Sequence, residues 1–298
     1  MALTFKEVRR LFQVPTRGRV RLKDYDPGWA GEKRLKNLTK TELKIRAEDF
    51  LHRNITELAN AQQRLSASDT HSVLIVFQAS EVAEQHRTIT HLMSVMSPRG
   101  CQIVSFKKPS SEALDQNFLR RYVKALPDPG RIGAFTRSYY EDVLVVRVRP
   151  ELIGRLPGPD PNRDFWRGRY DDINAFERQL RRNGTLILKF FLNVSRKEQR
   201  RRCLERPEKT FKFSVNDFEE RKYWSGYQDA FEQMVQHTST TWAPWWVIPA
   251  DHNWVTRALV VSIIVRSIDR LGITFPHVGV VTGRNTRCVV PPFPCSVS

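Results

Sequence analysis

The chain has 298 residues, 40% of them hydrophobic, which is enough to bury the core of one α/β domain of ordinary upper size. Its 49 Lys and Arg residues outnumber its 32 Asp and Glu residues, so the formal net charge is +17 at pH 7. This charge indicates a polyanionic partner such as nucleic acid, polyphosphate, a nucleotide or an anionic membrane face, with a merely solvated basic surface as the alternative.

Cysteine spacing and the first residues of the chain argue against several classes of protein. The four cysteines have no CxxC spacing and no histidine pair at zinc-finger intervals, so we expect free thiols rather than disulfides or a zinc site. Residues 1–10 are mixed and charged, without an apolar run long enough for a signal peptide or a membrane span. We therefore expect a soluble protein of the cytoplasm without a membrane partner.

Residues 1–40 are basic and interrupted by proline and glycine, which predicts an extended arm on the domain surface. From Thr41 to Leu65 apolar residues recur at helical spacing, which predicts a long helix covering one face of the domain. Short apolar runs then alternate with helical segments. The expected strands are residues 73–77, 102–106, 132–135, 186–192 and 245–248. The expected helical segments are residues 112–126, 163–183 and a long charged stretch from 195 to 238.

This alternation predicts a parallel sheet with helices on both faces. Ligands of such sheets bind at the carboxyl ends of the strands, so the loops that follow Phe77 and Phe135 should lie side by side at the site. Residues 77–89 follow the strand–loop–helix order of a phosphate site but contain neither glycine nor lysine, which such a loop uses to wrap and reach phosphates. Residues 277–298 lack periodicity and balanced charge, which predicts a loosely ordered tail.

Residues 195–227 combine many basic side chains with the aromatic residues Phe211, Phe213 and Trp224. Charge concentrated on helices beside the sheet predicts a lid that closes on a polyanion. A solvated helical face is the alternative interpretation of the same residues.

Several sequence blocks in a fixed order carry a likeness to a known family. They are residues 21–27 (RLKDYDP), 97–101 (SPRGC), 106–110 (FKKPS), 137–148 (RSYYEDVLVVRV), 187–192 (ILKFFL) and 248–251 (IPAD). On these blocks the chain resembles the polyphosphate kinase type 2 family, P-loop kinases similar in fold to thymidylate kinase, across residues 19–276. The resemblance implies a three-layer α/β/α P-loop kinase-like fold in residues 41–276, with a five-stranded parallel sheet and a helical lid at residues 195–225.

The resemblance also implies a reaction and its partners. Members of the family move phosphoryl groups between inorganic polyphosphate and nucleoside mono- or diphosphates, by in-line displacement without a covalent enzyme intermediate. We therefore expect polyphosphate, nucleotides of the AMP, ADP or GDP class, Mg²⁺ as cofactor and a homo-oligomeric assembly.

The loop after the first strand departs from the family pattern at several positions. Glu81 stands at the functional aspartate of the family and Gln85 at its lysine, while Ala83, Glu84 and Arg87 occupy glycine positions. Replacing the lysine by glutamine removes a charge that stabilises the transferred phosphoryl group, and electrostatic stabilisation supplies most of the catalysis in such enzymes. The added carboxylate of Glu84 is repulsive where a phosphate should lie.

The site residues are assigned by the same resemblance. Thr136 stands where the family has Asp or Asn before Arg-Ser. The implied catalytic residues are Glu81, Thr136 and Arg137, with Glu81 and Thr136 as weak Mg²⁺ ligands. The implied phosphate- and polyphosphate-binding residues are Arg87, Arg137, Arg200, Arg202, Arg206, Lys209 and Lys212. The implied nucleotide-binding residues are Gln85, Thr88, Asp251 and Asn253. Alternatively, some of the basic side chains pair with Glu198, Glu205, Glu208 or Glu219.

We therefore expect a phosphotransferase-family protein whose activity is reduced or lost by the altered loop. The alternative is a catalytically impaired paralogue, a pseudoenzyme, that binds polyphosphate or nucleotide or scaffolds active family members. A general nucleic-acid-binding function is disfavoured because the sequence contains no recognised nucleic-acid module.

Overall fold

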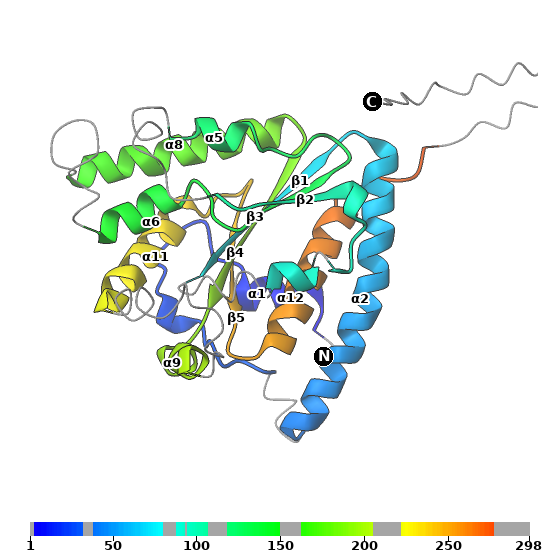
Figure 1. Cartoon of the computed structure of the whole chain (residues 1–298), viewed down its shortest axis with the longest axis horizontal. Coiled ribbons are helices and arrows are strands. Elements are labelled where there is room, and N and C mark those ends of the chain that lie inside the picture. Colours follow the sequence, from blue (N-terminus) through cyan, green and yellow to red (C-terminus); the bar gives the residue numbers. More distant parts are fainter. Residues whose placement is uncertain are drawn as a thin grey trace, which may run out of the picture.

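The computed structural model describes residues 3–31, 38–79, 88–92, 94–106, 118–149, 162–204 and 222–276. At its centre is a five-stranded parallel sheet with strand order β2-β3-β1-β4-β5 (Figure 1). The strands are β1 (Ser72–Ala79), β2 (Cys101–Val104), β3 (Ile132–Phe135), β4 (Thr185–Asn193) and β5 (Trp245–Pro249). The predicted parallel sheet is confirmed, with each strand within two residues of its expected position.

Helices cover both faces of this sheet. The α-helices are α1 (Phe5–Phe12), α2 (Lys40–Ser68), α5 (Arg120–Val123), α6 (Glu141–Val148), α8 (Arg163–Arg182), α9 (Arg196–Leu204), α11 (Trp224–Thr238) and α12 (Asn253–Asp269). In Figure 1, α2 and α12 lie on one side of the sheet and α6, α8 and α11 on the other. The result is the predicted three-layer α/β/α architecture. None of the helices in the described ranges is long and apolar enough to cross a membrane.

Strand β1 shows why its sequence is a continuous apolar run. Val73, Ile75 and Phe77 pack in the core shared with α2 and α12, whereas Leu74 and Val76 pack in the core shared with α6, α8 and α11. Successive side chains of a strand point to opposite faces, so a strand covered on both faces must be apolar at every position.

The expectation of an extended N-terminal arm is wrong for Phe5–Phe12, which form helix α1. Thr4 and Glu7 make a reciprocal capping box: the Glu7 backbone N–H donates to Thr4 Oγ1, and the Thr4 backbone N–H donates to a Glu7 carboxylate oxygen at 2.8 Å. Val8 and Phe12 are buried in the core beside α12. The Thr-x-x-Glu spacing ahead of an apolar stripe was the signal for this helix.

The apolar character of α12 explains why no helix was predicted there. Valine, isoleucine and leucine surround most of its circumference, because α12 is buried between α2 and the sheet. A helix that is apolar on nearly all sides shows no amphipathic stripe in the sequence. Within the predicted helical segment 112–126, only Arg120–Val123 is an α-helix among the described residues, and 107–117 lie outside them.

Candidate functional site

The ends of β1 and β3 lie side by side, as predicted. Val76 pairs with Phe135 in the parallel register, and the side-chain amide of Gln78 donates to the Ser138 hydroxyl at 3.1 Å. Both polar side chains are buried. This hydrogen bond joins the end of β1 to the segment that follows β3.

The altered loop itself lies outside the described residues, because they stop at Ala79 and resume at Thr88. The roles assigned to Glu81, Gln85 and Arg87 therefore stay predictions from the sequence. Thr88 is buried at the start of the next helical segment, and its nucleotide contact likewise stays a prediction.

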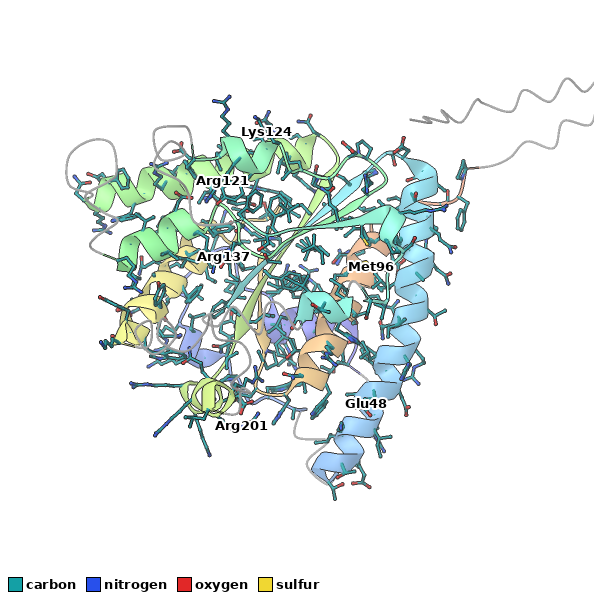
Figure 2. All side chains as sticks on the ribbon, viewed as in Figure 1. Glu48, Met96, Arg121, Lys124, Arg137 and Arg201 are labelled. Atoms are coloured by element: carbon teal, nitrogen blue, oxygen red, sulfur yellow. The ribbon has the colours of Figure 1, made fainter. Side chains whose placement is uncertain are left out.

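Arg137 and Glu141 face the same strand end. Arg137 is half-buried directly after β3 and lies near the centre of the molecule in Figure 2. Burial raises the pKa of the Glu141 carboxyl, an effect that the nearby Arg137 guanidinium and a hydrogen bond from Gln78 partly offset. A guanidinium is well suited to phosphate, which it binds through two parallel N–H groups.

Asp142, the second residue of α6, has an unsatisfied acceptor. Its Oδ2 atom is buried and has no hydrogen-bond partner among the described residues. Burial raises the pKa of the Asp142 carboxyl to about 6, although Arg121 and Arg169 oppose that rise. Both guanidiniums stack on aromatic rings, Arg121 over Tyr122 and Arg169 over Phe118. A buried acceptor without a donor destabilises the fold, which makes Asp142 a candidate to accept a hydrogen bond from a ligand.

Sequence reasoning gave no role to Glu141 or Asp142. The available signal was a pair of carboxylates in the first turn of a helix that directly follows a strand end. That position lies at the edge of a parallel sheet where ligands bind.

The variant Asp142→Asn is expected to be more stable than the parent at pH 7.5. The shift from 3.8 to about 6 means that the folded protein takes up a proton in this pH window which the unfolded chain does not, so stability rises as the pH falls through it. Asparagine removes a penalty of at most about 3 kcal/mol, which corresponds to several degrees in Tm. Thermal unfolding from pH 4 to 8 checks this.

The gain should be largest above pH 6 and small near pH 4, because the folded-state carboxyl is then protonated and that of the unfolded chain is partly protonated. The matched control is Asp172→Asn on the exposed face of α8, which should leave Tm unchanged at every pH. A gain that is absent, or that does not depend on pH, would contradict the buried and unsatisfied state of Asp142.

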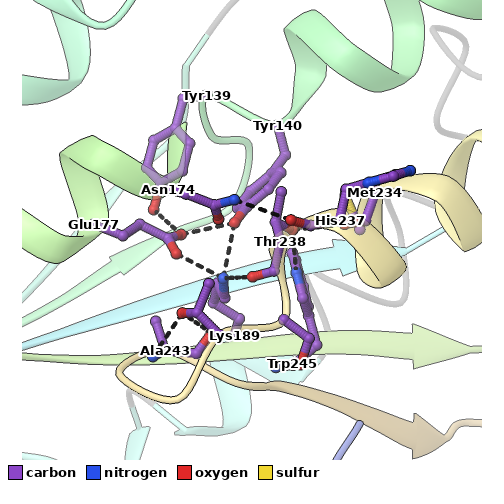
Figure 3. A network of polar contacts seen from close by, with 12 residues as sticks. Tyr139, Tyr140, Asn174, Glu177, Lys189, Met234, His237, Thr238, Ala243 and Trp245 are labelled. Atoms are coloured by element: carbon purple, nitrogen blue, oxygen red, sulfur yellow. Dashed lines mark hydrogen bonds and ion pairs between the residues drawn. The ribbon is translucent and has the colours of Figure 1, made fainter. Parts of the chain in front are cut away.

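A fully buried ion pair holds the residues that follow Arg137 (Figure 3). Lys189 on β4 donates to Glu177 on α8 at 2.6 Å and also to the Thr238 carbonyl at 2.7 Å, and neither charged side chain has any exposed surface. The hydroxyls of Tyr139 and Tyr140 donate to the other carboxylate oxygen of Glu177 at 2.8 and 2.7 Å. Desolvation lowers the pKa of Lys189, and the Glu177 carboxylate opposes this shift. The network therefore anchors the chain immediately after Arg137 and Ser138.

The basic residues of helix α9 differ in their exposure to solvent. Arg200 and Arg201 are exposed, whereas Arg202 is buried. Arg202 donates to Glu198 at 2.7 Å and to the carbonyl of Ala250 at 2.7 Å. This geometry agrees with the alternative, an ion pair with Glu198, and the phosphate contact of Arg202 stays a prediction. The remaining predicted lid residues Arg206, Lys209 and Lys212 lie outside the described residues.

Asp251 and Asn253 also have partners within the protein. Asp251 Oδ1 accepts from the backbone N–H of Ser195 at 2.8 Å, and Asn253 Oδ1 accepts from Arg202 at 3.1 Å. These acceptors hold the start of α9, and the predicted contact of both side chains with a nucleotide base stays a prediction.

Hard oxygen ligands for Mg²⁺ are few in the described part of the chain. No group of three His, Cys, Asp or Glu side chains gathers there as a metal site. Mg²⁺ is commonly held by one or two protein oxygens together with substrate phosphates, so a complete protein cage is not required. The half-buried Thr136 follows the end of β3 and carries a buried hydroxyl oxygen, and its weak Mg²⁺ contact stays a prediction.

A parallel sheet with helices on both faces, and charged groups that follow the end of β3, define the chain as an α/β protein of the kind whose ligands bind at the carboxyl ends of the strands. Residues 42–275 match the family model of polyphosphate kinase 2, and the chain belongs to this family.

Relatives and solved structures agree with this assignment. An ADP-polyphosphate phosphotransferase from Rhodopseudomonas palustris is 42% identical over 242 residues, which cover 79% of this chain and 84% of the relative. An AMP/ADP-polyphosphate phosphotransferase from Meiothermus ruber is 37% identical over 273 residues, which cover 89% and 95%. The crystal structure of polyphosphate kinase 2 from Arthrobacter aurescens is similar with a TM-score of 0.80 and 31% identity, covering 91% of this chain and 92% of that one.

Proposed function

We propose that the protein binds inorganic polyphosphate and a nucleotide of the AMP, ADP or GDP class, and transfers phosphoryl groups between them slowly. The observation that carries the proposal is the joined end of β1 and β3, where the Gln78–Ser138 hydrogen bond brings Arg137 and Glu141 to the edge expected to bind phosphate. The similarity to the ADP- and AMP/ADP-polyphosphate phosphotransferases of R. palustris and M. ruber supports polyphosphate and adenine nucleotides as substrates.

Each described residue at this edge has a defined part in the proposal. Arg137 binds and orients a phosphate group and offsets charge that develops during in-line transfer, while Glu141 holds the guanidinium in place. Asp142 accepts a hydrogen bond from a donor group of the nucleotide. Mg²⁺, when bound, supplies further neutralisation of phosphate charge, with Thr136 and Glu81 as its protein oxygen ligands. The proposal includes a cytoplasmic location and a homo-oligomeric assembly.

Transfer is expected to be slow because of the sequence between β1 and Thr88. Gln85 replaces the family lysine, and losing one such electrostatic group slows comparable reactions by about a hundredfold. The same substitutions favour a second candidate function, a non-catalytic paralogue that binds the substrates or scaffolds active family members. An assay with purified protein, polyphosphate, Mg²⁺ and AMP, ADP, GMP or GDP distinguishes the two. Nucleotide product above background supports transfer, and its absence with binding intact supports the paralogue.

Binding of long-chain polyphosphate is expected to be tight at low salt and to weaken steeply as salt increases. The net charge of +17 and the exposed Arg200 favour contacts with a polyanion, and each phosphate contact steepens the dependence of affinity on salt. The variant Arg200→Ala should reduce that slope by about one contact. The control is Arg182→Ala on α8, which also removes one exposed charge. Undetectable binding at low salt would overturn the proposed function.

A further inference from the structure

We infer that Arg202 is a positioning residue, which docks α9 on the carboxyl ends of β4 and β5 and so fixes where the exposed basic side chains of α9 meet polyphosphate. This inference rests on the proposed function for the identity of the polyanion. The docking itself rests on contacts within the protein.

The Arg202 guanidinium is the centre of these contacts. It donates to Glu198 one turn earlier in α9, to the carbonyls of Ala250 and Asp251 at 2.7 and 3.2 Å, and to Asn253 Oδ1 at 3.1 Å. One side chain thus connects α9 to two residues of the loop after β5 and to the first residue of α12. The planar guanidinium with several N–H donors can satisfy such a set, whereas the compact ammonium of lysine cannot reach all of it.

The surface that receives Arg202 is itself fixed by hydrogen bonds. Asp251 binds the Ser195 N–H at the start of α9 and donates its own N–H to the carbonyl of Pro27 at 3.1 Å. Asn193, the last residue of β4, accepts from the Ala250 N–H through its carbonyl and donates from its side chain to the carbonyl of Tyr25. The loop after β5, the end of β4 and the segment around Tyr25 therefore form one platform under α9.

The neighbouring arginine is a natural control. Arg201 pairs with the same carboxylate, Glu198, at 2.6 Å, but its side chain is 54% exposed, against 3% for that of Arg202. In Figure 2 Arg201 lies on α9 at the outer margin of the molecule. Hydrogen bonds from Arg201 and Arg202 lower the pKa of Glu198 to about 2, so the carboxylate is ionised at neutral pH with either partner. The two arginines share a helix, a charge and a partner, and differ in whether they reach the platform.

The test compares Arg202→Lys, Arg202→Ala and Arg201→Ala. Affinity for long-chain polyphosphate is measured across a series of salt concentrations, and hydrogen exchange is measured on α9 and β1. If Arg202 positions α9, both Arg202 variants should lose affinity at least about tenfold, because several polyphosphate contacts of α9 are displaced together. The salt slope should then fall by more than one contact. Exchange should rise in α9 and not in β1. Arg201→Ala removes one exposed charge of α9, so it should lower the salt slope by about one contact and leave the exchange of α9 unchanged.

Lysine distinguishes positioning from direct phosphate contact, because it keeps the positive charge but not the fork of donors. A lysine variant that binds polyphosphate like the parent, or an Arg201→Ala variant that loses as much as Arg202→Ala, would overturn the inference. If the Arg202 variants do not fold, Asn253→Ala removes one acceptor while leaving the buried cation paired with Glu198. Faster exchange in α9 is then expected, and unchanged exchange would overturn the docking role.

The exchange measurement keeps the inference separate from the proposed function. If the parent does not bind polyphosphate at low salt, the proposed substrate is wrong, and faster exchange of α9 in Arg202→Lys still shows that Arg202 docks the helix. If the parent binds and exchange of α9 is unchanged in Arg202→Lys, the proposed function stands and the positioning role is wrong.

Discussion

The variant Lys189→Met is expected to lose about 3–5 kcal/mol of folding stability, because it leaves the Glu177 carboxylate buried without a cation. The loss should exceed that of an ordinary core substitution, since the hydroxyl of Tyr140 and the Thr238 carbonyl lose their donor at the same time. Urea unfolding at pH 7.5 measures the difference. The control is Lys124→Met, which changes an exposed lysine (Figure 2) and should shift stability by less than about 0.5 kcal/mol.

The double variant Lys189→Met/Glu177→Met tests whether the loss of stability comes from the unpaired Glu177 carboxylate. Replacing both members of a buried ion pair with apolar side chains is often neutral for stability, so most of the loss should be recovered. Activity should not recover with it, because the hydroxyls of Tyr139 and Tyr140 then lack the acceptor that anchors the chain after Arg137. A single variant as stable as the parent would refute the importance of the pair.

Restoring the family residues in the altered loop is expected to raise phosphoryl transfer by at least about a hundredfold, given the effect of single electrostatic groups in comparable enzymes. The changes are Glu81→Asp, Ala83→Gly, Glu84→Gly, Gln85→Lys, Arg87→Gly and Thr136→Asp. The scaffold should tolerate them, because they follow strand ends and leave the apolar positions of β1 and β3 intact. Steady-state rates with polyphosphate and ADP or GDP measure the gain.

A partly restored protein that keeps Gln85 is the matched control and should recover little of the rate. If the fully restored variant is folded by circular dichroism but no faster than the parent, the defect lies outside this loop. A parent that is already fast would show that the substitutions do not impair transfer, and that Glu81 or Arg87 has a role not assigned to it here.

Strand positions could be predicted from the sequence because a strand buried on both faces is a continuous run of apolar residues. The run of valine, leucine, isoleucine and phenylalanine in β1 is short and rich in β-branched residues, which favours a buried strand over a buried helix. Pairing of β1 with β3 then followed from the general rule for ligand sites in parallel sheets. The same reasoning could not find α12, since burial on nearly every side removes the helical stripe.

Side-chain partners were harder to predict. Arg200 and Arg202 belong to one basic run, and only the folded position of the β5–α12 loop decides that Arg202 is buried and Arg200 exposed. The sequence contains a weaker indication of the Lys189–Glu177 pair, which could have predicted it. A lone lysine in an apolar strand needs a buried partner, and Glu177 lies on the apolar stripe of α8 beside Phe176.

The N-terminal segment packs into both cores of the domain. Similarity to the family model begins at residue 42, yet Val8 and Phe12 belong to the core beside α12, and Val14 and Leu22 belong to the core on the opposite face of the sheet. Between them the chain passes the outer edge of β5, where the Val14 N–H donates to the Trp245 carbonyl. An uncovered edge strand is a template for pairing with other chains. Residues of α1 and of the segment after it therefore contribute to both cores, and Gln13 and Val14 occupy the edge of β5 that would otherwise be open to such pairing.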